Sequence, residues 1–264
     1  MVVGIYFSPT GGTRNIAAYV SRMLARRLGT DYRLKSYTLP AERTNWQPID
    51  SQDIIVWASP VYAGKTPNKM LDFATQTLQG HGNKGIAIAV FGNRDYDNAL
   101  AEMTAIMRQG GITPIAAAAI VDRHTFAPND IASDRPNDND FNQINNWIES
   151  IDLNTEQVVS VPGSADAPYY RPLKNDRTPA NFLKAKPQLN VSRCHSCGQC
   201  QHVCPMGSIT FHGTPDFGGI CIKCQACIQT CTSQALSFND PDFISHVDML
   251  CEHHSHPAAN SFFC

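Results

Sequence analysis

No cysteine precedes Cys194 in this chain of 264 residues, and all 10 cysteines lie between Cys194 and Cys264. A secreted framework held by disulfides would not leave most of its chain without a cysteine, so this distribution excludes that class of protein. The cysteines are better explained as metal-centre ligands that are confined to a module of their own.

The sequence also lacks a charge excess, a long apolar run and a basic leader. Lys and Arg number 21 against 23 Asp and Glu, which gives no indication of a nucleic-acid partner or an anionic membrane surface. No uninterrupted run reaches the roughly 18 apolar residues of a membrane-spanning helix, and no signal peptide is recognised at the start. We therefore expect a cytoplasmic protein that binds neither nucleic acid nor a membrane.

Residues 1–152 alternate between the patterns of strands and helices. Continuous apolar runs such as "DIIVWAS" and "GIAIAVFG" are typical of parallel strands buried on both faces, and Ile16, Val20, Leu24 and Leu28 repeat at helical spacing. Five strands that alternate with helices predict an α/β fold with a doubly wound, five-stranded parallel sheet.

Three further regions are predicted after this domain. Residues 153–190 are rich in proline and polar residues and form a linker, and Tyr169, Tyr170 and Phe182 indicate that the linker packs along a surface. The remaining regions are the cysteine module, residues 191–240, and an irregular tail, residues 241–264.

The cysteine module contains an internal duplication. "CHSCGQCQHVCP" begins at Cys194 and "CIKCQACIQTCT" begins at Cys221; each has the spacing C-x2-C-x2-C-x3-C, and each cysteine of the first recurs at the same offset in the second. The duplicated motif resembles that of bacterial ferredoxins with two 4Fe–4S clusters, which are small α+β domains. In this motif the fourth cysteine of a repeat binds the other cluster. The resemblance therefore implies one cluster on Cys194, Cys197, Cys200 and Cys231, and a second on Cys221, Cys224, Cys227 and Cys204.

Zinc is the alternative occupant of these cysteines. Zinc sites usually pair their ligands across longer loops, so a third cysteine at the same tight spacing favours the clusters. One residue departs from the ferredoxin pattern, because Cys204 is followed by Pro205 but Cys231 is followed by Thr232. This departure concerns the local backbone and leaves the ligand set intact.

The tail contains another set of possible metal ligands. These are Cys251, His253, His254 and His256; Cys264 also lies outside the repeats. A solvated tail with a stray thiol is the simpler interpretation, because no second ligand pair is nearby in sequence.

The stretch "FSPTGGTRN", residues 7–15, places hydroxyls and glycines between a strand and a helix. Backbone amides and the positive end of the helix dipole make such a junction a binding site for an anion. A Walker A loop requires a lysine after its glycines and a dinucleotide fingerprint requires a third glycine, and both are missing here. The loop resembles the phosphate loop of flavodoxins, S/T-x-T-G-x-T, at Ser8, Thr10, Gly11 and Thr13, which implies that the anion is the phosphate of FMN.

Two further loops resemble the flavin-ring loops of flavodoxins. "SPVYAGKTP" follows the third predicted strand and "FGNRDYDNAL" follows the fourth. Flavodoxin-like sheets, with the strand order 2-1-3-4-5, bind FMN at the carboxyl ends of their strands. Tyr62 and Tyr96 are the candidates for stacking on the ring, and Gly92 and Asn93 for contacting it through backbone groups. The implied FMN-binding residues are Ser8, Thr10, Gly11, Gly12, Thr13, Ser59, Pro60, Val61, Tyr62, Gly92, Asn93, Asp95 and Tyr96.

Together these features resemble fusions of a flavodoxin-like domain with a two-cluster ferredoxin domain. The resemblance implies electron transfer within one chain, in which the clusters exchange single electrons with FMN and with a redox partner protein or a small-molecule acceptor. No catalytic residue is identified, and no nicotinamide-binding fingerprint is present.

Two other functions stay open at this point. FMN could reduce a small molecule in a pocket built by residues 122–137, with His124, Arg94 and Asp95 as candidate polar groups. Alternatively, the chain could be a binding module without redox chemistry, with zinc on its cysteines.

Overall fold

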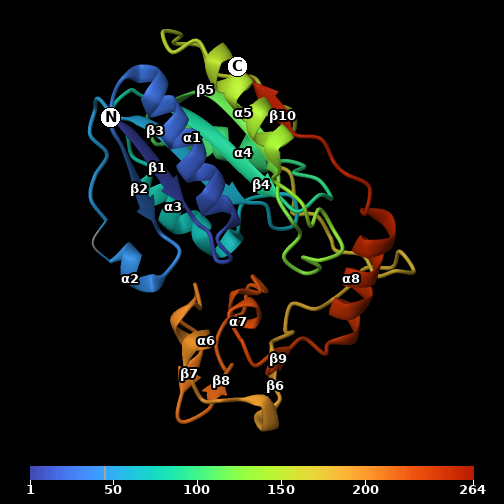
Figure 1. Ribbon diagram of the computed structural model, residues 1–264. Helices are drawn as coiled ribbons and strands as arrows, with labels where there is room; N and C mark the ends of the chain where they lie inside the picture. The colour runs from blue at the N-terminus through green and yellow to red at the C-terminus, as the bar shows by residue number, and fades with distance from the viewer. Residues whose placement is uncertain (45) are drawn as a thin grey trace.

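The computed structural model describes residues 1–44 and 46–264. Its largest element is a sheet with the strand order β10-β5-β4-β3-β1-β2 (Figure 1). The strands are β1 (Val2–Tyr6), β2 (Tyr32–Ser36), β3 (Ile54–Pro60), β4 (Asn83–Phe91), β5 (Ile112–Val121) and β10 (Ser261–Phe263). Strands β1 to β5 are parallel to one another. Their order, 2-1-3-4-5, confirms the predicted doubly wound sheet and is that of the flavodoxin-like fold.

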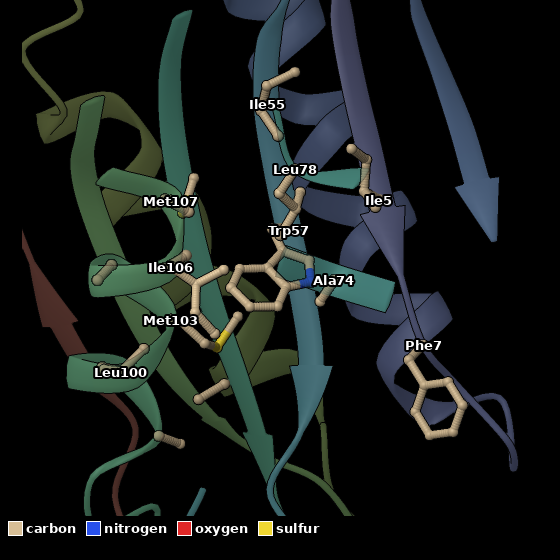
Figure 2. Packing of buried hydrophobic residues seen from close by; sticks show 14 of the residues in the cluster. Ile5, Phe7, Ile55, Trp57, Ala74, Leu78, Leu100, Met103, Ile106 and Met107 are labelled. Carbon is tan, nitrogen blue, oxygen red and sulfur yellow. The ribbon is translucent and has the colours of Figure 1, made fainter. Parts of the chain in front are cut away.

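Helices cover both faces of this sheet and bury its apolar runs. The helices of one face are α1 (Gly12–Leu28) and α5 (Asp138–Ser150), and those of the other are α3 (Leu71–Thr77) and α4 (Ala99–Gln109). Neighbouring residues of β3 point to opposite faces, so that Trp57 packs with α3 and α4 while Val56 packs with α1 and α5. Figure 2 shows Met103 and Ile106 of α4 on the Trp57 side of the sheet. The continuous apolar pattern of the strands follows from this double burial.

Short elements and loops complete this domain. They include α2 (Pro40–Arg43), which follows β2, and the 3-10 turn η1 (Asn68–Met70), which precedes α3. Within the described part of the chain, no helix is both long and apolar enough to cross a membrane.

The prediction of an irregular tail over residues 241–264 is wrong. Residues Pro241–His253 form the helix α8. The Asp240 carboxylate caps its amino end by accepting a hydrogen bond from the Phe243 amide at 2.9 Å, and Pro241 occupies the first turn. Asp followed by Pro is a start signal for a helix, so this element could have been found from the sequence.

The tail also adds a sixth strand to the five that were predicted. β10 pairs with β5 in antiparallel orientation, with Phe262 opposite Ala118. The Trp147 indole of α5 donates a hydrogen bond to the Phe263 carbonyl at 3.2 Å, which anchors the strand to the helix layer. The tail therefore covers the edge of the sheet that β5 would otherwise expose.

The segment between the two domains packs along the surface of the first. The amide of Tyr170 donates to the Ala63 carbonyl at 2.8 Å, and the Tyr169 hydroxyl donates to the Thr66 carbonyl at 2.9 Å. Lys65 donates in turn to the carbonyl of Ala165 at 2.7 Å. This segment therefore holds the loop that follows β3 in place through hydrogen bonds.

The cysteine module lies beyond the carboxyl ends of the parallel strands (Figure 1). Its elements are β6 (Gln188–Leu189), η2 (Val191–Arg193), α6 (Gln199–His202), β7 (Thr210–Phe211), β8 (Pro215–Asp216), α7 (Ala226–Gln229) and β9 (Leu236–Ser237). β6 pairs with β9 and β7 pairs with β8, both antiparallel. Because β6 belongs to this module, the module begins before residue 191, the boundary expected from the sequence.

Candidate functional site

The loop between β1 and α1 has the geometry of an anion site. Gly11 has a φ of 93° and precedes the first residue of α1, a conformation that favours glycine. The Ser8 hydroxyl accepts the Arg14 amide at 2.9 Å and so holds the loop closed. In residues 1–44 and 46–264, the amides of residues 10–13 have no hydrogen-bond acceptor, and neither hydroxyl of Thr10 and Thr13 is paired. These free donors at the start of a long helix are suited to a phosphate group.

A carboxyl group that the sequence analysis did not select lies against this loop. An ideal Cβ placed on Gly12 would lie 1.6 Å from Oδ2 of Asp122, the residue that follows β5. The other carboxyl oxygen of Asp122 accepts the Arg123 amide at 2.9 Å. Burial raises the pKa of Asp122 to about 6. A side chain at position 12 would therefore require the Asp122 carboxyl group to move, and the loop has an acid with a raised pKa beside it.

The two ring loops lie side by side at the carboxyl edge of the sheet. Tyr6 of β1 is paired with Ala58 of β3, and Pro60 of β3 is paired with Val90 of β4. The strand ends that carry the three predicted flavin loops are therefore consecutive neighbours. This is the place where a flavodoxin-like sheet binds its ligand.

Tyr62 and Tyr96 have different surroundings. Tyr96 packs its ring against Phe91 with the ring centres 5.6 Å apart. Tyr62 lies in a tight turn, where its amide donates to the Lys65 carbonyl at 2.8 Å. Burial raises the pKa of Tyr62 well above its usual value, and the negative charges of Cys224 and Cys221 add to the increase. This ring loop therefore lies close to the cysteines of the second repeat at Tyr62.

The side chain of Asn93 holds the tail against the ring loop. Its amide nitrogen donates to the carbonyls of His254 at 2.6 Å and His256 at 2.8 Å, and its oxygen accepts the Ala258 amide at 2.8 Å. The side chain of Asn93 is therefore engaged by the tail, and contact of its backbone with a ligand stays a prediction. Asp95 is exposed and accepts the Asp97 amide at 2.9 Å.

His124, a candidate from the sequence, packs against the second ring loop. An ideal Cβ on Gly92 would lie 2.5 Å from Cδ2 of His124. Burial, with smaller contributions from His246, Arg94 and His254, lowers the pKa of His124 to about 4. The imidazole is therefore neutral near pH 7, and Nδ1 accepts the Phe126 amide at 3.2 Å.

The cysteines of the two repeats interleave in space. Cys204 from the first repeat and Cys221, Cys224 and Cys227 from the second line a single cavity. Cys194 and Cys197 lie close enough for their charges to raise the pKa of Cys200, although burial is the larger cause. Cys231, from the second repeat, packs in the same apolar cluster as Cys200, and this cluster also includes Cys204 and Cys227.

The backbone around both repeats orients the sulfur atoms in the same way. The Sγ of Cys194 accepts the Ser196 amide and the Sγ of Cys221 accepts the Lys223 amide, both at 3.4 Å. Ser196 and Lys223 both have positive φ, 52° and 57°. Hydrogen bonds from amides to sulfur tune the reduction potentials of iron–sulfur clusters, so the chemistry of this donor set suits such clusters.

The cysteine and histidines of the tail do not converge. In the described part of the chain, no three Cys, His, Asp or Glu side chains are grouped closely enough to hold a single metal ion. Cys251 lies on α8 and packs partly against the apolar cluster of Met249 and Leu250.

Comparison with known proteins finds a match to part of the cysteine module. Residues 187–210 match the family model described as a 4Fe-4S binding domain. The comparison with curated proteins finds no match.

Several solved structures resemble the first domain. The flavodoxin of Streptococcus pneumoniae TIGR4 is 22% identical with a TM-score of 0.40, and the match covers 56% of this chain and 96% of that one. The two-electron reduced flavodoxin of Megasphaera elsdenii is 19% identical with a TM-score of 0.41, covering 55% and 96%. An NADH:FMN oxidoreductase in its apo form is 15% identical with a TM-score of 0.42, covering 63% and 96%.

The flavodoxin-like assignment rests on the parallel strand order of the sheet rather than on these similarities. The second assignment rests on the matched family model, which implies at least one 4Fe–4S cluster. The chain thus joins a domain with the flavodoxin-like fold to a cysteine module that contains a match to a 4Fe-4S binding domain.

Proposed function

We propose that this chain transfers electrons between two 4Fe–4S clusters and an FMN bound at the carboxyl edge of the sheet. The observation that carries this proposal is the contact between the two domains. Ile222, between two cysteines of the second repeat, packs against the same apolar cluster as Val61 and Tyr96 from the ring loops. The second set of cysteines therefore adjoins the place where the flavin ring would lie.

The residues of the first domain suit FMN. The unpaired amides of residues 10–13 and the hydroxyls of Thr10 and Thr13 would hold the phosphate. The ring loops would hold the flavin through Tyr96, Tyr62 and the backbone of Gly92 and Asn93. When bound, FMN supplies a centre that exchanges one or two electrons, whereas each cluster exchanges one.

The alternative function is reduction of a small molecule at the flavin. Such a reaction needs an opening over the ring loops. Tyr170 is hydrogen-bonded to Ala63 of one ring loop, and His254 to Asn93 of the other. Because the linker and the tail pack against these loops, the contacts favour electron exchange through the ferredoxin domain.

Electron transfer to an FMN bound within the chain can be distinguished from electron transfer to free FMN that collides with the chain in solution. The FMN-free chain is reduced anaerobically until the cluster absorbance is bleached, and FMN is then added at increasing concentrations. We expect the rate of absorbance recovery to become independent of FMN concentration once the site is filled. The matched control is the double variant Thr10→Ala, Thr13→Ala, in which the rate should still rise with FMN. A wild-type rate that rises in proportion to FMN without saturating would refute transfer within the chain.

The carboxyl group of Asp122 should make FMN binding depend on pH. Its pKa, about 6 in the free protein, should rise further when the anionic phosphate binds nearby, because like charges disfavour the carboxylate. Binding then takes up a proton, so the affinity should fall as the pH rises from 5 to 8. A further rise of about one pKa unit corresponds to a roughly tenfold loss of affinity across this range.

The measurement is a titration of FMN fluorescence at each pH, in wild type and Asp122→Asn. The phosphate of FMN titrates in the same range, but it does so in both proteins, so the difference between the two profiles belongs to Asp122. We expect Asp122→Asn to bind FMN more tightly than wild type at pH 8 and with equal affinity at pH 5. If the affinities of wild type and Asp122→Asn change with pH in parallel, Asp122 lies too far from the phosphate to affect FMN binding.

A further inference from the structure

One of the two sets of cysteines lies closer to the flavodoxin-like domain than the other. The inner set is Cys204, Cys221, Cys224 and Cys227, and the outer set is Cys194, Cys197, Cys200 and Cys231. Met206 and Ile222, beside the inner cysteines, pack against the apolar cluster of the first domain. Arg43 of α2 donates a hydrogen bond to the Pro205 carbonyl, next to Cys204.

Two more contacts hold the inner side of the module to the first domain. Gln229 of α7 donates to the Thr125 carbonyl at 3.3 Å. An ideal Cβ on Gly207 would lie 3.1 Å from Pro40. The contacts at Pro205 and Gly207 fix the Cys204 side of the inner set against the first domain, and Gln229, between Cys227 and Cys231, adds a further contact.

The loop of the outer set faces the solvent. Cys197 is exposed, as are Val191, Arg193 and His195 around it. Among the hydrogen bonds of the described residues, none joins residues 191–203 to residues 1–152. A second protein can therefore approach the outer set more closely than the inner one.

The charge of the outer loop is of one sign. The sequence contains no acidic residue between Asp176 and Asp216, and Arg193 lies directly before Cys194. Within the described residues, no ion pair neutralises Arg193. Val191 adds an apolar side chain that is 68% exposed. An exposed apolar side chain beside an unpaired cation suits a transient complex with an acidic protein surface.

We propose that electrons enter and leave the chain through the outer set of cysteines, on a surface that fits a redox protein with an acidic docking face, and that the inner set connects the outer set to the flavin. The proposal rests on the proposed function for its two clusters. It adds the path of the electrons, which runs from the partner protein to the outer cluster, then to the inner cluster and then to FMN, or in reverse. One electron passes at each step, so that each centre is oxidised as the next is reduced, and no group is transferred.

The test uses the EPR signals of the reduced holoprotein and two soluble chromium(III) complexes of opposite charge. Tris(oxalato)chromate(III) is an anion and hexaamminechromium(III) is a cation; each broadens the signal of a cluster that it approaches. The signal that persists in Cys204→Ala identifies the outer cluster, and Cys204→Ser serves the same purpose if the alanine variant does not fold. We expect the outer signal to broaden at several-fold lower concentrations than the inner one, and the anion to be more effective than the cation.

Arg193→Glu should abolish or reverse the preference for the anionic complex. Arg26→Glu is the matched control, because Arg26 is exposed near the carboxyl end of α1, at the end of the sheet away from the module. It should leave the preference unchanged. The proposed sequence of centres is refuted if the signal of the inner cluster broadens at lower concentrations than that of the outer cluster. The proposed acidic partner surface is refuted if the cationic complex broadens the outer signal more effectively than the anionic one. Neither result requires bound FMN, so failure of the flavin site would be recognised separately.

Discussion

Replacing Cys204 by Ala is expected to remove the cluster bound by Cys221, Cys224 and Cys227, although Cys204 belongs to the first repeat. All four side chains line one cavity, and loss of one thiolate leaves an iron with an open position that dissociates readily. Anaerobic reconstitution should then yield about four irons per chain instead of about eight, because each 4Fe–4S cluster needs four cysteine ligands. EPR of the reduced protein should retain one of its two cluster signals.

Two further variants serve as controls for the Cys204→Ala result. Cys194→Ala should remove the other signal, since Cys194 lies with Cys197 and Cys200. Cys251→Ala, outside both repeats, should retain both. If Cys204→Ala and Cys194→Ala abolish the same signal, each repeat binds its own cluster and the crossed assignment is wrong.

Riboflavin is expected to bind far more weakly than FMN, because it lacks the phosphate. The free amides of residues 10–13 and the hydroxyls of Thr10 and Thr13 would have no other anion to bind. A hydrogen bond to a charged group contributes about 1.5–3 kcal/mol, so each of Thr10→Ala and Thr13→Ala should weaken FMN binding roughly ten- to a hundredfold. Fluorescence titrations with both flavins measure these affinities.

The matched variant Thr13→Ser keeps the hydroxyl and should keep most of the affinity for FMN. Riboflavin binding should hardly change in any of these variants, because its ring and ribityl chain do not require the phosphate loop. Equal affinities for FMN and riboflavin in the wild type would show that "SPTGGT" is only a tight turn between β1 and α1.

The sheet and the ligand repeats could be predicted because their signals are local. Each parallel strand appears as an unbroken apolar run, since Trp57 and Val56 are buried on opposite faces. The cysteine repeats are contiguous motifs whose spacing follows from cluster geometry. The anion-binding loop was likewise indicated by one short stretch, "FSPTGGTRN", between a strand and a helix.

Contacts between distant segments could not be predicted in this way. Asp122 follows β5 and Gly12 begins α1 directly after β1, so their proximity arises only from the folded sheet and not from a local pattern. The side chain of Asn93 binds the carbonyls of His254 and His256, which no pattern in either segment indicates. β10 is short and gains its stability from pairing with β5, so it has little signal of its own.

The central claim is that one chain holds iron–sulfur clusters and FMN together. Its most direct test is the iron, acid-labile sulfide and flavin content of one anaerobically purified and reconstituted sample. We predict about eight irons and eight sulfides per chain, with one tightly bound FMN. A stable chain that retains zinc without iron, or an iron-loaded chain that binds no FMN, would contradict the account.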